Sequence, residues 1–109
     1  MSDLAQSSAR FIEKFSQLAK RLANMGVTTH TADLKWGSFG CFTLMVMKEK
    51  EAIRFQYDGR DSFVTVEGSP VREYSYPNEW KELTVKGMDN RSDEVLTFIE
   101  EFLGKRFNF

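Results

Sequence analysis

The stretch SFGCFTLMVMKEKEAIRFQYDGRDSFVTVEG, residues 38–68, predicts three consecutive antiparallel strands joined by two tight turns. Apolar and polar residues alternate along it, which is the period of a strand with one buried face. Asp58-Gly59 lies between two alternating runs. This pair favours a type I′ hairpin turn over residues 57–60, because such a turn needs positive φ at both central positions. Residues 38–68 therefore decide the fold.

The two turns set the register of the three strands. The type I′ turn places Tyr57 opposite Arg60, and the charged run at residues 48–51 makes the preceding turn, so that Phe42 faces Tyr57. A slip of one residue would send every apolar side chain to the other face. The face predicted to be buried comprises Phe42, Leu44, Val46, Ile53, Phe55, Tyr57, Val64 and Val66.

The opposite face of these strands has a mixed character. It carries apolar side chains among threonines, an arginine and a glutamine, although a sheet face in contact with water is normally polar. Such a face needs a cover, which a tail of the chain, a partner chain or a ligand would provide. As an interaction face we nominate five of its residues, which are Phe39, Met45, Met47, Arg54 and Phe63.

Two amphipathic helices flank the strands. Apolar residues recur at spacings of four and three over residues 3–25, which predicts a helix of about six turns ending at Gly26. A second helix is predicted to begin near Ser92 and to end at Gly104. Since each helix has one apolar stripe, we expect both to pack on the same sheet face.

The remaining segments add to the sheet. Residues 80–86 alternate as a further strand, and Ser69-Pro70 is expected to stop the strand before it, because proline cannot donate to a ladder. For residues 27–31 and 71–76, the sequence does not decide between a strand and a connecting segment. The predicted class is α+β: a long N-terminal helix, an antiparallel meander sheet of four to five strands, and a C-terminal helix, in a single domain over residues 1–109.

Composition bounds the class of protein. The 109 residues are 41% hydrophobic, which is enough for one core without a metal or a disulfide. A single cysteine, no apolar run long enough to span a bilayer, and an N-terminus without a signal-peptide pattern lead us to expect a cytoplasmic protein that does not enter a membrane. The formal net charge of −1 argues against nucleic acid as the partner.

No catalytic signature accompanies this architecture. His30 and Cys41 are each the only residue of their type, and a nucleophilic pair would need them side by side, which nothing in the spacing demands. One imidazole and one thiol also fall short of a zinc site. Asp58 and Asp61 are explained by the turn that they flank. We therefore expect no catalytic residue, no metal and no cofactor, and we lean away from an enzyme.

Two functional readings follow. The first is a small non-enzymatic binding or protein-interaction module that self-associates, as a homodimer, through the mixed sheet face; its partner is then itself or another protein. The alternative is a small-molecule carrier or an enzyme with an apolar pocket between the sheet and the long helix. The candidate lining of that pocket is Trp36, Tyr57, Tyr74 and Trp80.

Overall fold

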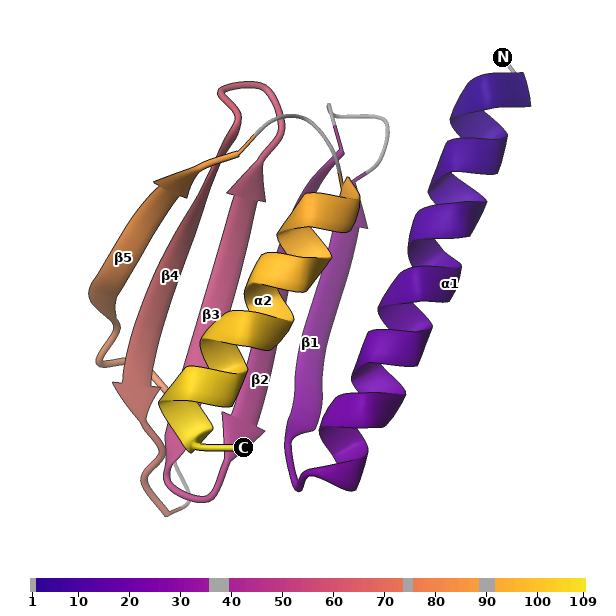
Figure 1. Cartoon of the computed structure of the whole chain (residues 1–109). Helices are drawn as coiled ribbons and strands as arrows, with labels where there is room; N and C mark the ends of the chain where they lie inside the picture. Colours follow the sequence, from indigo (N-terminus) through magenta and orange to yellow (C-terminus); the bar gives the residue numbers. More distant parts are fainter. Residues whose placement is uncertain (1, 36–39, 74–75, 89–91) are drawn as a thin grey trace.

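The computed structural model of the chain describes residues 2–35, 40–73, 76–88 and 92–109. Two helices flank five strands (Figure 1). In chain order the elements are α1 (Ser2–Asn24), β1 (Thr28–Lys35), β2 (Cys41–Lys48), β3 (Glu51–Asp58), β4 (Phe63–Pro70), β5 (Lys81–Gly87) and α2 (Ser92–Phe107).

The strands form one antiparallel sheet in the order β1-β2-β3-β4-β5, so each strand pairs with its neighbour in sequence. This meander between two helices confirms the predicted α+β class, with five strands as the number. The segment left open at residues 27–31 belongs to β1, which continues to Lys35 and contains a bulge between Thr29 and Thr31.

The predicted register of β2 and β3 is confirmed. Phe42 pairs with Tyr57, and Lys48 pairs with Glu51 across a two-residue turn. Glu49 in that turn has a φ of 55°, the left-handed conformation that tight hairpin turns require. The alternation of apolar side chains and the charged turn were therefore sufficient to fix this hairpin.

The predicted register of β3 and β4 is wrong. Tyr57 pairs with Val64 and not with Arg60, and residues 59–62 form a longer loop. The Asp58 carboxylate accepts hydrogen bonds from the backbone N–H groups of Arg60 (2.9 Å) and Asp61 (3.0 Å), and the positive φ falls at Ser62 (57°). The Asp58 side chain thus organises this loop in place of a type I′ turn. The pairing shifts by an even number of residues, so the predicted buried face is still correct.

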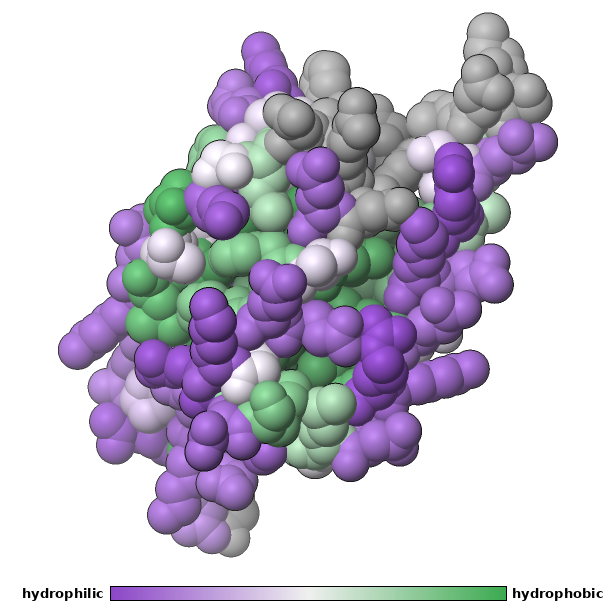
Figure 2. Space-filling view, in the orientation of Figure 1, coloured by the Kyte–Doolittle hydropathy of each residue, from purple (hydrophilic) through white to green (hydrophobic). Residues whose placement is uncertain are grey.

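Both helices pack on that face, which we call the inner face (Figure 1). The Phe11 ring of α1 lies 5.6 Å from the Phe42 ring of β2, and the Phe102 ring of α2 lies 5.8 Å from the Phe55 ring of β3. Figure 2, which views this side, shows hydrophobic side chains gathered in the middle of the face, along and beside α2, and hydrophilic ones over most of the periphery. The core therefore lies between the sheet and the two helices.

Two ion pairs at the margin of the core connect α2 to α1 and to the β2–β3 turn. Arg21 of α1 donates two hydrogen bonds to Glu100, at 2.7 and 2.9 Å, and Arg106 binds Glu51 at the β2–β3 turn with the same two-pronged geometry. The Arg21 guanidinium lowers the pKa of the Glu100 carboxyl by hydrogen bonding to its ionised form.

In the described part of the chain, neither α1 nor α2 is long and apolar enough to cross a membrane.

Two predicted boundaries are corrected. Strand β4 continues through Ser69 and ends at Pro70, which pairs with Glu51. The missing N–H of the proline therefore affects only the last position of the strand. Helix α2 continues past Gly104 to Phe107, and the Gly104 carbonyl accepts a hydrogen bond from the Phe109 N–H. Packing of the last turn against the sheet outweighs the low helix propensity of one glycine.

Candidate binding face

The outer face of the sheet is the side opposite the two described helices. Strand alternation assigns its residues: Phe55 points into the core, so its neighbours Arg54 and Gln56 point outward. By the same alternation the face carries Met45 from β2 and Glu67 from β4, which flank Arg54 on either side. This is the mixed face that the sequence predicted to need a cover.

The described residues of the β4–β5 connection, 71–73 and 76–80, supply a cover for part of the face. The connection leaves β4 at Pro70, and yet the Tyr76 ring lies against the ring of His30 in β1, at 5.5 Å with edge-to-face geometry. Since β2 and β3 separate β1 from β4, the connection reaches across those strands before it returns to β5. On the way back, the Trp80 ring lies over the Arg54 guanidinium at 4.2 Å.

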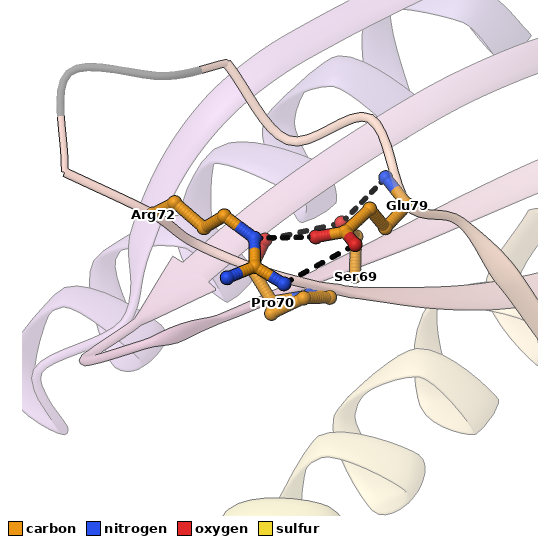
Figure 3. A network of polar contacts seen from close by, with 4 residues as sticks. All are labelled: Ser69, Pro70, Arg72 and Glu79. Atoms are coloured by element: carbon orange, nitrogen blue, oxygen red, sulfur yellow. Dashed lines mark hydrogen bonds and ion pairs between the residues drawn. The ribbon is translucent and has the colours of Figure 1, made fainter.

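The base of the connection is closed by polar contacts (Figure 3). Arg72 donates two hydrogen bonds to the Glu79 carboxylate, at 2.6 and 3.2 Å, and this lowers the pKa of Glu79. The Glu79 backbone N–H donates to the Ser69 hydroxyl at 3.1 Å, and that hydroxyl donates in turn to the Pro70 carbonyl. The two ends of the connection are thus held together, as in a compact Ω-type loop.

The covered part of the outer face is buried. Met45 is 2% exposed, Ala52 is fully buried and Ser69 is 2% exposed, and Pro77 of the connection is buried as well. The expectation that Met45 is an exposed contact for another chain is therefore wrong. Met45 pairs with Arg54, and Arg54 lies against the Trp80 ring, so we infer that the β4–β5 connection contributes to the burial of Met45.

Beyond the connection, the outer face opens into a groove of about 610 Å³. Its floor comes from the first residues of β2 and β4 and the last residues of β3, and its rim comes from the end of β1 and the β3–β4 loop. The lining combines threonines, a glutamine, a thiol and aromatic residues with charges of both signs. The lining residues are Asp33, Lys35, Cys41, Phe42, Thr43, Gln56, Tyr57, Asp58, Arg60, Phe63 and Thr65.

A row of polar side chains separates the groove from the covered part. Glu67 accepts a hydrogen bond from Arg54 Nε at 3.0 Å and another from Gln56 Nε2 at 2.6 Å. The bond from Arg54, assisted by Gln56, lowers the pKa of the Glu67 carboxyl, although partial burial opposes the shift. Since Gln56 also lines the groove and Arg54 lies under Trp80, this row connects the groove to the β4–β5 connection.

The nominated interaction residues do not form one exposed patch. Phe63 lines the groove and is half-buried, Met47 is half-buried, and Arg54 belongs to the polar row. Met45 is covered, and Phe39 lies outside the described residues. The nomination missed several residues of the groove, above all Thr43, Gln56 and Thr65. Strand alternation places them on the same face as Arg54, so the sequence pattern could have identified them.

The alternative pocket is not assembled by the residues that the structure describes. Tyr57 is buried on the inner face, where its ring lies 5.5 Å from Phe42, whereas Trp80 lies on the outer face over Arg54. Trp36 and Tyr74 fall outside the described residues. The Tyr57 ring and the Trp80 ring are therefore on opposite sides of the sheet, and Tyr57 borders the outer-face groove as a strand residue whose side chain points inward.

The outer face brings together no catalytic pair from the two unique residues. Cys41 pairs with Lys35 at one end of the β1–β2 hairpin, whereas His30 lies near the other end and bonds the Thr31 hydroxyl at 2.7 Å. Within the described ranges, no three histidine, cysteine or carboxylate residues cluster in a way that would hold a metal ion.

Comparison with known proteins gives no further guide: no family model matches the chain, and no curated protein or solved structure matches it either. Function is therefore inferred from the geometry of the outer face.

Proposed function

We propose that this protein is a small non-enzymatic binding module that receives a segment of a partner protein in the outer-face groove. The observation that carries the proposal is the groove itself, about 610 Å³ on the sheet face that neither described helix covers. Its floor is made by regular strands, which hold side chains more rigidly than loops do.

The chemistry of the lining supports a protein partner. Thr43, Gln56 and Thr65 offer hydrogen bonds, and Phe63 offers apolar area, a mixture typical of non-obligate interfaces. The groove lies open across four strands, whereas small-molecule pockets bury about 70–90% of their ligand. An extended segment that carries both polar and apolar side chains fits such a groove better than a small molecule does.

The partner is either a second copy of this chain or a different protein. Met45 is not a contact for a second copy, because its side chain is buried within the monomer. Any homodimer would have to use the groove. Light scattering at high micromolar concentration separates the two cases: a dimeric mass that Thr65→Arg reduces to a monomer identifies a second copy, and a monomeric mass identifies a different protein.

Cys41 provides the direct test, since it is the only cysteine and it lines the groove. A photocrosslinker attached to Cys41 should capture a partner. The same label on Glu101→Cys in a Cys41→Ser background, exposed on α2, should not capture it. Addition of Thr65→Arg should abolish the capture by charging the floor. Capture of the same partner from both labelled positions, or capture unaffected by Thr65→Arg, would refute the proposal.

A further inference from the structure

We propose that the β4–β5 connection is an internal placeholder on the binding face, and that a partner segment carrying an aromatic side chain displaces it. The partner half of this inference rests on the proposed function. The part of the inference that concerns the connection needs no partner, because the contacts of the connection show which side chains the covered part of the face binds.

That chemistry is aromatic. The Trp80 ring lies over the Arg54 guanidinium at 4.2 Å, and the Tyr76 ring meets His30 edge-on. A guanidinium already held by Glu67 presents a flat cationic surface, which attracts the face of any aromatic ring. A ring from a partner can replace Trp80 without any change in the sheet beneath it.

A small number of polar and ring contacts tie the described residues of the connection to the sheet. The Arg72–Glu79 pair is exposed on both sides and screened by salt. Two backbone N–H groups bond outside the connection, that of Glu79 to the Ser69 hydroxyl and that of Val71 to the Lys50 carbonyl, and Pro77 is buried. Tyr76 at the tip is 62% exposed. The described residues of the connection are not part of a strand. Segments with such few ties open at a lower free energy than the whole domain.

Opening would extend the groove. Beyond Arg54 the floor continues onto Met45, Met47 and Ala52, which turns a mainly polar groove into one with an apolar end. Methionine side chains adapt their shape to different partners. A partner that binds the groove and displaces Trp80 would therefore gain apolar contacts that the closed form withholds.

Thiol labelling measures the opening without any partner. In a Cys41→Ser background, Met45→Cys places a thiol under the connection, and iodoacetamide reports its exposure. We expect labelling with a much weaker urea dependence than global unfolding, because only a local segment opens. Labelling that follows global unfolding, in rate and in urea dependence, would overturn the placeholder.

The aromatic requirement is tested at position 80. Trp80→Gly should speed labelling at position 45 by about tenfold, since the stacking contact that holds the connection is lost. Trp80→Phe, which keeps a ring, should label much more slowly than Trp80→Gly, and indole at millimolar concentration should restore protection to Trp80→Gly. The natural Cys41 of the groove, in an otherwise unchanged Trp80→Gly chain, is the control and should keep its labelling rate.

Three results count against the proposal: no acceleration in Trp80→Gly, no distinction between glycine and phenylalanine, or no rescue by indole. The far-UV circular dichroism of each variant verifies that it is folded, and the urea dependence in the Trp80-containing chain tests the opening independently. None of these measurements uses a partner, whereas crosslinking from Cys41 does not depend on the connection, so the two proposals fail separately.

Discussion

The Trp80 ring lies 4.2 Å from the Arg54 guanidinium, whose Nε donates to Glu67 at 3.0 Å, so that one arginine ties the β4–β5 connection to the sheet. The same glutamate accepts from Gln56 of the groove. The covered and open parts of the outer face therefore meet at Arg54.

Arg54→Met tests how much this arrangement stabilises the fold. The change keeps an apolar stem but removes the guanidinium, leaving a partly buried carboxylate without its charged donor. We expect a loss of about 1–3 kcal/mol of unfolding free energy in urea titrations. Arg60→Met, on the exposed β3–β4 loop, is the control and should change stability by less than about 0.5 kcal/mol. Equal effects of the two changes would contradict the arrangement.

The Glu67 carboxyl should make stability depend on acid pH. Its pKa is lowered in the fold, so its contribution is fully present above the unfolded value of about 4.3 and is lost as pH falls through the lower folded pKa. Glu67→Gln should therefore flatten the decline in unfolding free energy between about pH 6 and about pH 2.5. Arg54→Met should flatten it similarly. A decline in Glu67→Gln parallel to that of the wild type would show that the pair contributes nothing.

Replacement by alanine should lower the unfolding free energy strongly at one isoleucine of the helices and hardly at all at another. Ile99 of α2 is fully buried, so Ile99→Ala should cost about 2–5 kcal/mol through lost burial and a residual cavity. Ile12 of α1 is 54% exposed, so Ile12→Ala should stay within about 0.5 kcal/mol of the wild type. Urea unfolding of both variants checks the packing of the helices, and comparable losses would mean that α1 is packed differently.

Glycine should stabilise the β3–β4 loop at the position that has a positive φ. Ser62 has a φ of 57°, which strains a residue with a Cβ, so Ser62→Gly should stabilise by about 0.5–1 kcal/mol. Ser16→Gly, within α1, should instead destabilise by about 0.5 kcal/mol, because glycine disfavours helix interiors. Thermal unfolding compares the two, and destabilisation by Ser62→Gly would support a different loop.

The sequence determined faces more reliably than turns. In β2 and β3, alternation and a short charged turn agree, and the pairing of Phe42 with Tyr57 was predictable. At the next turn, Asp58-Gly59 resembles a type I′ signal, but Asp58 uses its carboxylate to close a longer loop. Backbone propensity does not report such a side-chain contact. The described residues of these strands still lie on the faces that were predicted for them.

The candidate site was harder to predict because its cover comes from far along the chain. Alternation placed Met45 and Arg54 on the outer face, but nothing local indicates that Tyr76 reaches His30 or that Trp80 reaches Arg54. The predicted pocket joined Tyr57 to Trp80 because both are aromatic. Tyr57 follows strand parity into the core, whereas Trp80 lies in a connection that has no such period.

The central claim is that partners bind in the outer-face groove. Amide chemical shifts of the labelled chain, followed during titration with the partner captured through Cys41, test it most directly. The account predicts that the largest changes fall at Cys41, Thr43, Gln56 and Thr65, with α1 and α2 little affected. The largest changes on the two helices, with these four amides unmoved, would contradict it.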